Sequence, residues 1–134
     1  MSSIPSPEHT SERVALVTGA SSGIGEAVSR SLAQRGFRLV LAARRMDSLR
    51  QLAAQIESQG GEALAVQADL ADSEQTRALV DQAMERFARI DVLVNNAGYG
   101  EGGPIELQGR DVMRRQFEVN LFAALELCGL VAPI

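Results

Sequence analysis

Closely spaced glycines mark a stretch of this chain that could hold a phosphate group. Residues 18–25 read Thr-Gly-Ala-Ser-Ser-Gly-Ile-Gly and follow the apolar run at residues 14–17. Glycine permits a sharp turn, and missing side chains let backbone N–H groups approach a pyrophosphate at the start of the next helix. We therefore predict a dinucleotide-binding turn here, with a plain tight turn as the alternative. The residues expected to bind the cofactor are Gly19, Ser21, Ser22, Gly23, Ile24 and Gly25.

Two arginines, Arg44 and Arg45, follow the second apolar run, residues 37–43. In NAD-binding chains an acidic residue in this neighbourhood binds the ribose 2′-hydroxyl, but here no acid occurs before Asp47. A planar guanidinium binds oxyanions through paired hydrogen bonds and suits a 2′-phosphate. The pair favours NADP(H) over NAD(H), and the alternative is two solvated loop arginines.

Polar side chains also follow the third and fourth apolar runs. Asp69, with Leu70 behind it, ends the run at residues 63–68, where a solvated aspartate at a helix entry is the alternative. Asn95 begins the stretch Asn-Asn-Ala-Gly after residues 90–94, at the strand end where ligands bind in open α/β sheets. This stretch adds three candidate cofactor-binding residues, Asn96, Ala97 and Gly98.

One amide stands in a helix that is otherwise apolar. Asn120 lies within residues 110–131, which we predict to be a single long helix. A polar group among apolar residues needs a partner, so a role beyond packing is expected, with a solvent-facing asparagine as the alternative.

The elements that must position these residues alternate regularly along the chain. Short apolar runs read as strands, and the segments between them carry apolar residues at helical spacing. Ile24 is among the residues expected to face the sheet from the first helix. Because strand–helix–strand units connect in a right-handed sense, we expect an α/β fold with a parallel sheet.

Length and composition narrow the functional classes. The 134 residues fit one domain, and a net charge of −4 argues against nucleic acid or an anionic membrane as the main partner. No apolar run approaches the roughly 18 residues of a membrane span. A single cysteine, Cys128, forms no internal disulfide, which favours the cytoplasm; we expect it to be buried in the last helix. Residues 1–12 are predicted to be a mobile tail, residues 13–134 the folded domain, and no metal site is predicted.

The motifs in this order resemble the short-chain dehydrogenase/reductase family over residues 13–134. They are the glycine turn, Asp69-Leu70, Asn-Asn-Ala-Gly at residues 95–98, and Val-Asn-Leu around Asn120. The resemblance implies a Rossmann-type three-layer fold with strand order 3-2-1-4. It also implies an oxidoreductase that transfers hydride between NADP(H) and an alcohol or carbonyl substrate, and a homo-oligomer of the complete protein.

The resemblance also implies roles for single residues. Asp69 would accept a hydrogen bond from the adenine amino group, and the backbone N–H of Leu70 would serve the ring. Ala97 and Gly98 would leave room for the cofactor ribose. Asn120 would hold a water molecule in a proton relay.

The catalytic part of the family pattern is absent from this chain. The family uses a serine and a Tyr-x-x-x-Lys, but all 13 basic residues here are arginine and no serine follows Ser73. The single tyrosine, Tyr99, directly follows the Asn-Asn-Ala-Gly stretch. We therefore expect the later strands to be missing and the chain alone to be inactive. The favoured hypothesis is the cofactor-binding portion of an oxidoreductase. The alternatives are a non-catalytic nucleotide-binding module and a non-functional truncated product.

Overall fold

A computed structural model describes residues 12–134, and nearly all of the predicted tail at residues 1–12 lies outside the described residues. The main strands and helices are β1 Val14–Thr18, α2 Gly23–Gln34, β2 Arg38–Ala43, α3 Met46–Ser58, β3 Ala63–Gln67, α4 Ser73–Phe87, β4 Val92–Val94, α5 Arg110–Phe117 and α6 Ala123–Val131. The strands form one parallel sheet in the order β3-β2-β1-β4. The predicted α/β fold and strand order are confirmed.

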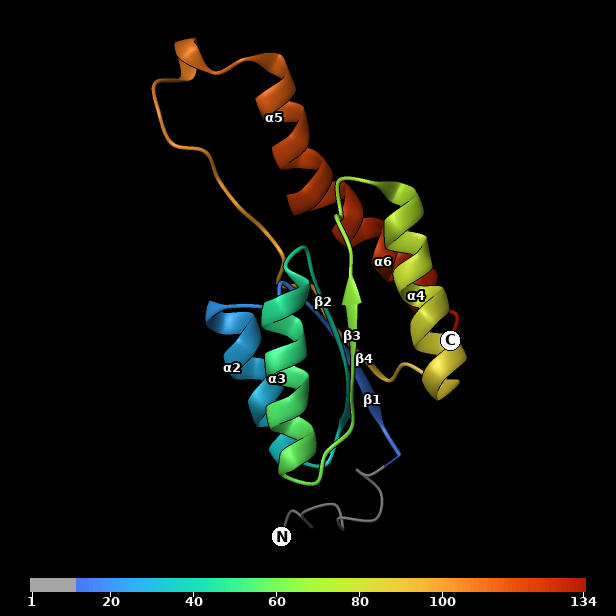
Figure 1. The fold of residues 1–134 in the computed structure, drawn as a ribbon. Coiled ribbons are helices and arrows are strands. Elements are labelled where there is room, and N and C mark those ends of the chain that lie inside the picture. The colour runs from blue at the N-terminus through green and yellow to red at the C-terminus, as the bar shows by residue number, and fades with distance from the viewer. Residues whose placement is uncertain (1–11) are drawn as a thin grey trace, which may run out of the picture.

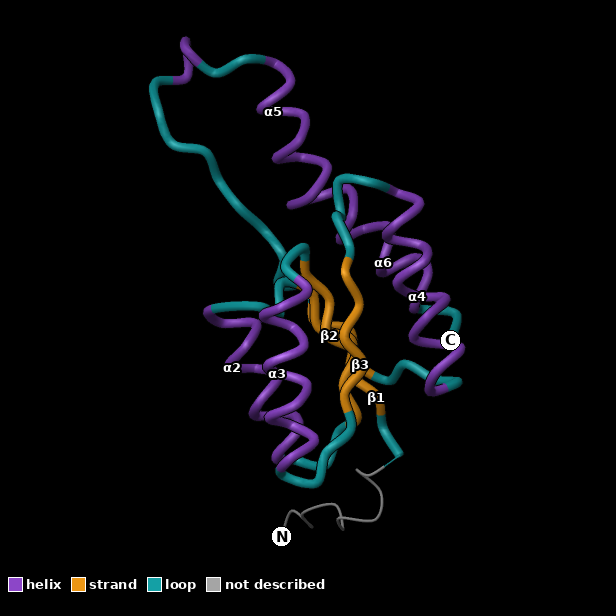
Figure 2. Tube along the Cα trace, viewed as in Figure 1, coloured by secondary structure: helices purple, strands orange, loops and turns teal. Residues whose placement is uncertain are grey.

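Helices cover both faces of the sheet (Figure 1). Ala15 and Val17 of β1 pack on the side of α3, whereas Val14 and Leu16 pack on the side of α4 and α6. Strand residues alternate between the two faces, so a strand buried on both sides reads as a continuous apolar run. The three layers of a Rossmann-type fold follow from this pattern (Figure 2).

The predicted long helix at residues 110–131 is not a single regular helix. A π-helical turn, η2 Glu118–Phe122, separates α5 from α6. The loop after β4 carries a 3₁₀ turn, η1 Ile105–Leu107, and leads away from the sheet to α5, which projects beyond the layers (Figure 1). Asn120 lies in the π turn, and such turns are frequent at functional sites.

Several apolar residues of this last segment remain exposed, among them Phe117, Phe122 and Leu125. Cys128 is also exposed, so the expectation that it is buried is wrong. It accepts a hydrogen bond from Asn95 Nδ2 at 3.3 Å. Since Asn95 Nδ2 also donates to the Ala124 carbonyl, Asn95 ties the end of β4 to α6.

The fourth strand is shorter than the sequence suggests. The apolar run predicts a strand over residues 90–94, but β4 spans Val92–Val94. Asp91 precedes it and accepts a hydrogen bond from the Val14 N–H at 2.8 Å, so its side chain joins the starts of β1 and β4. Among residues 12–134, no helix combines the length and the hydropathy that a membrane span needs.

Candidate functional site

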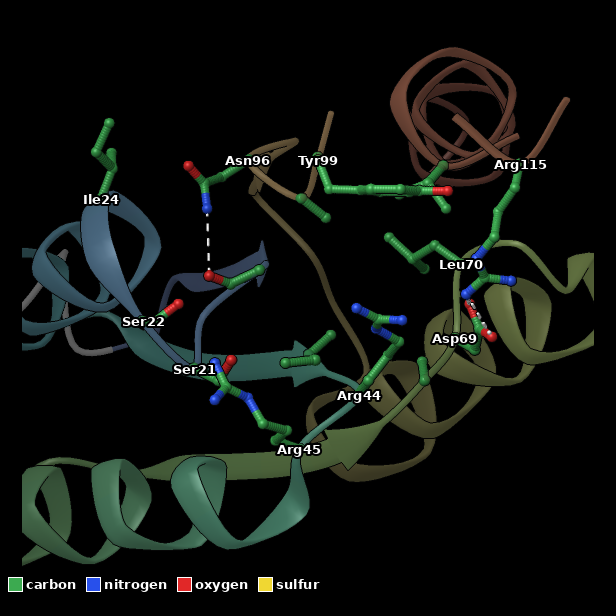
Figure 3. A pocket seen from close by; sticks show the side chains of 17 residues that line it. Ser21, Ser22, Ile24, Arg44, Arg45, Asp69, Leu70, Asn96, Tyr99 and Arg115 are labelled. Atoms are coloured by element: carbon green, nitrogen blue, oxygen red, sulfur yellow. Dashed lines mark hydrogen bonds and ion pairs between the residues drawn. The ribbon is translucent and has the colours of Figure 1, made fainter. Parts of the chain in front are cut away.

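A pocket of about 550 Å³ lies where the carboxyl ends of the strands meet (Figure 3). This volume suits a small-molecule or cofactor site. Its wall contains most of the predicted cofactor-binding residues, namely Gly19, Ser21, Ser22, Ile24, Arg44, Arg45, Asp69, Leu70, Asn96, Ala97 and Gly98. Gly23, Gly25 and Asn120 do not line it.

The glycine turn forms one end of the pocket and is closely packed. Gly19 has φ +62°, and a Cβ there would lie 2.8 Å from Asn96 Nδ2. A Cβ on Gly25 would lie 2.2 Å from the Gly19 carbonyl oxygen. Gly25 therefore allows α2 to start directly against the turn. It does not line the pocket itself, and its effect on the pocket is through the position of the turn.

The N-terminus of α2 is open toward the pocket. Ser22 is the N-cap residue, and its side chain makes no capping hydrogen bond within the described chain. Gly23 has φ +56°. Apart from Gly23, its chain neighbours and the backbone of the first turns of α2, no heavy atom among residues 12–134 lies within 4 Å of the position that a Cβ would take. First-turn N–H groups of a helix lack intrahelical partners, so they remain available for an anion. This cradle fits a pyrophosphate.

Ile24 differs from the sequence expectation. Its side chain is 75% exposed instead of facing the sheet. It stands in the first turn of α2, which lies over the glycine turn, and its side chain points away from the sheet (Figure 3). The expectation was wrong because the spacing of apolar residues along a helix does not show that its first turn extends past the end of the sheet.

Thr18 and Asn96 join the glycine turn to the loop after β4. Thr18 Oγ1 accepts hydrogen bonds from the Asn96 N–H at 3.1 Å and the Ala97 N–H at 3.0 Å. Asn96 Nδ2 donates to the carbonyls of Thr18 and Gly19, both at 3.2 Å. Asn96 thus holds the turn in place. Sequence reasoning missed Thr18 as its partner, although a hydroxyl ending an apolar strand is a visible signal.

The two arginines after β2 stand on the pocket wall. Both are exposed, and Arg44 extends into the pocket while Arg45 extends toward Ser21 (Figure 3). The Arg44 carbonyl accepts a hydrogen bond from Gln67 Nε2 at 3.0 Å, which ties the end of β2 to the end of β3. Two guanidinium groups beside the helix N-terminus give this side of the pocket a positive charge.

Asp69 lies at the opposite end of the pocket and pairs with Arg115 of α5. Arg115 Nη2 is 3.3 Å from Oδ1 and 3.2 Å from Oδ2 of Asp69. Partial burial opposes ionisation of Asp69, but the Ala71 N–H and the Arg115 guanidinium outweigh it and hold its pKa below the usual value. The pairing raises the pKa of Arg115 in turn. Sequence reasoning did not identify Arg115, which is 46 residues from its partner.

Asn120 holds the backbone of Tyr99. Its Oδ1 accepts from the Tyr99 N–H at 2.9 Å, and its Nδ2 donates to the Tyr99 carbonyl at 2.6 Å. The Tyr99 ring extends across the pocket above Leu70 (Figure 3). The Tyr99 hydroxyl is buried without a hydrogen-bond partner among residues 12–134. Asn120 therefore does not line the pocket, but it holds the backbone of Tyr99, which does.

No group of His, Cys, Asp and Glu side chains within residues 12–134 is arranged to hold a metal ion.

Comparison with known proteins agrees with this geometry. The model of the family described as short chain dehydrogenase matches residues 13–134. An uncharacterised oxidoreductase of Listeria innocua is 36% identical over 121 residues, which cover 90% of this chain and 49% of that protein.

Solved structures share the fold over nearly the whole chain. A metagenomic short-chain oxidoreductase in complex with NADP is 41% identical, with a TM-score of 0.88 over 92% of this chain and 56% of that one. A short chain dehydrogenase/reductase from Burkholderia phymatum in complex with NAD is 34% identical, with a TM-score of 0.87 over 91% of this chain and 43% of that one. The chain spans about half the length of the proteins it matches.

Proposed function

This chain belongs to the short-chain dehydrogenase family, and we propose that it is the NADP(H)-binding portion of an oxidoreductase. The complete protein would act on an alcohol or carbonyl substrate. The observation that carries this proposal is the pocket at the strand ends, which has an uncapped helix N-terminus at one end and a carboxylate at the other.

The chain's own residues divide the binding task. The N–H groups at the start of α2, with Ser21 and Ser22, would hold the pyrophosphate. Ala97 and Gly98 would leave room for a ribose, and Asp69 with the Leu70 N–H would bind the adenine. The bound nicotinamide would donate the hydride to a carbonyl or accept it from an alcohol. A proton-relay role for Asn120 stays a proposal, and its contacts with Tyr99 support a role in shaping the site.

A preference for NADP(H) over NAD(H) is supported by Arg44 and Arg45. Both line the pocket directly after β2, where a 2′-phosphate would meet an exposed guanidinium. The metagenomic relative was solved with NADP, although the Burkholderia protein was solved with NAD.

A nucleotide-binding module without turnover is the second candidate. It is favoured by the absence of lysine from all 134 residues and of serine after Ser73. The coding sequence after Ile134 separates the candidates, because a downstream serine and Tyr-x-x-x-Lys would support the oxidoreductase.

Three further parts of the proposal concern the whole protein. Residues 13–134 would form one dinucleotide-binding domain. The exposed apolar residues Phe117, Phe122 and Leu125 support a homo-oligomer of the complete protein. The single cysteine supports a cytoplasmic location.

A titration of the 134-residue chain with NADPH, followed by the nicotinamide emission, tests the proposal. The chain contains no tryptophan, so its own emission interferes little. Saturable binding that is tighter for NADPH than for NADH is expected. No saturable binding would mean that this chain does not hold the cofactor.

A further inference from the structure

The ion pair between Asp69 and Arg115 lies at the end of the pocket away from the glycine turn. Asp69 follows β3, whereas Arg115 reaches the carboxylate from α5 (Figure 3). Both side chains line the pocket. Although α5 projects beyond the layers of the fold, the Arg115 guanidinium extends from it to the pocket wall.

The Asp69 carboxylate keeps the capacity to accept a further hydrogen bond. Its Oδ1 accepts from the Ala71 N–H at 3.0 Å and from Arg115, and its Oδ2 accepts from Arg115. An ionised carboxylate offers about four acceptor positions. The neighbouring Leu70 and Ala68 give this end of the pocket apolar surface. A flat heterocycle with an N–H donor at its edge fits these surroundings.

We propose that Arg115 is a positioning residue for base recognition: it fixes the Asp69 carboxylate so that the pocket selects an adenine over a hypoxanthine base. This inference rests on the proposed dinucleotide-binding function. Adenine presents an amino donor at the position where hypoxanthine presents a carbonyl oxygen, and a carboxylate accepts from the donor and repels the oxygen. The rest of the two dinucleotides is identical.

The pair is suited to orienting a ligand group more than to stabilising the fold. The side chains of Arg115 and Asp69 are 41% and 34% exposed, and exposed ion pairs contribute little to folding. The guanidinium contacts both carboxylate oxygens, which restricts rotation of the carboxylate. Burial opposes ionisation of Asp69, and the Ala71 N–H and the Arg115 guanidinium lower its pKa, so both contacts favour the ionised acceptor.

The test compares dissociation constants for NADPH and for its hypoxanthine analogue, measured by calorimetry on the 134-residue chain. A hydrogen bond to a charged group predicts that the unmodified chain prefers NADPH by about tenfold or more. Arg115→Met is expected to lower this preference to about threefold or less, and Arg115→Lys to restore part of it. Arg114→Met is the matched control. It removes a guanidinium from the position directly before Arg115, which is exposed and lies outside the pocket wall.

Asp69→Asn provides a second variant, because it keeps the shape of the side chain while removing its charge. It is expected to lower the preference as Arg115→Met does. An unchanged or raised preference in Arg115→Met overturns the inference, as does an equal loss of affinity for both dinucleotides, which would mark Arg115 as a tether of α5. If the unmodified chain binds neither dinucleotide, the proposed function itself fails and the inference fails with it.

Discussion

At the residue scale, the contact between Gly25 and the Gly19 carbonyl decides how closely α2 can approach the turn. A Cβ at Gly25 would lie 2.2 Å from that oxygen and 2.5 Å from Asn96 Nδ2. We expect Gly25→Ala to lower the free energy of unfolding by about 1–3 kcal/mol, as overpacking of a tight site does. Urea unfolding measures the loss, and calorimetry should show weaker NADPH binding.

Gly129→Ala is the control for this substitution. Gly129 lies in α6. Apart from Gly129, its chain neighbours and the adjacent helix backbone, no heavy atom of residues 12–134 lies within 4 Å of the position that a Cβ would take there. Alanine has the higher helix propensity, so the variant should be as stable as the original chain or more stable. Equal stability of Gly25→Ala and Gly129→Ala would show that the turn is looser than the structure indicates.

The charge of Arg44 is expected to set the preference between the two dinucleotides. Arg44→Asp places an acceptor for a ribose hydroxyl where the structure has a guanidinium that can bind a 2′-phosphate. We predict about tenfold or more loss of NADPH affinity, with a gain for NADH, because a charged hydrogen bond is exchanged for repulsion. Arg50→Asp, at an exposed position of α3 outside the pocket wall, is the control in the same titrations. Unchanged NADPH affinity in Arg44→Asp would make the assignment wrong.

Residue types predicted much of the pocket but few of its internal contacts. Gly19, Arg44 and Asp69 all lie on its wall, as their places at strand ends indicated. Thr18 and Arg115 were missed because their partners are 78 and 46 residues away, and spacing along the chain carries no information on such pairs.

At the element scale, the π turn between α5 and α6 holds the loop after β4 through Asn120. Asn120→Ala removes both hydrogen bonds to the Tyr99 backbone. The Tyr99 amide should then exchange its hydrogen at least about tenfold faster, since losing a bond worth about 1 kcal/mol raises the open population several-fold and two bonds are lost. Amide exchange measured by NMR tests this. Glu118→Ala, at an exposed position of the same turn, is the control and should leave the exchange rate of the Tyr99 amide unchanged. Similar Tyr99 exchange rates in the two variants would contradict the hydrogen bonds between Asn120 and Tyr99.

The starts of β1 and β4 are joined by Asp91, which makes stability depend on pH. The Arg89 guanidinium lowers the pKa of Asp91 most, burial works against it, and the Val14 N–H lowers it further. A carboxylate with a depressed folded-state pKa stabilises the fold above its unfolded value of about 3.9, and this contribution is lost as pH falls through the folded value.

Asp91→Asn is therefore expected to cost about 1 kcal/mol at neutral pH, the usual worth of such a hydrogen bond. The difference from the original chain should shrink once pH falls below about 3.9, where the carboxyl is increasingly protonated. Urea midpoints at both pH values measure it, with Asp81→Asn at an exposed position of α4 as the control. A cost for Asp91→Asn that stays constant across this range would be inconsistent with an ionised contact.

Regular elements were more predictable than their interruptions. Continuous apolar runs indicated buried parallel strands because both faces of the sheet are covered. The π turn was not predicted, because residues 110–131 keep an apolar helical pattern through it. The short β4 was not predicted either, because Ile90 is buried in the core without joining the strand.

At the scale of the whole molecule, one edge of the layered fold gathers every group proposed to bind the dinucleotide. The carboxyl ends of the parallel strands carry the glycine turn, Arg44, Asp69 and Asn96 to a single pocket. Sequence order separates these groups, and the strand order β3-β2-β1-β4 brings them together. The topology therefore explains how motifs spread along the chain form one site.

The most direct test follows the backbone amides of the ¹⁵N-labelled 134-residue chain by NMR while NADPH is added. Saturable shifts are predicted at the glycine turn, at Arg44, at Leu70 and at Gly98, which surround the pocket. A separate hollow on α5 is lined by Arg110, Met113 and Phe117. The chemical shifts of the amides of these three residues should not change. Shifts confined to that hollow, or no saturable shifts at all, would contradict a dinucleotide site at the strand ends.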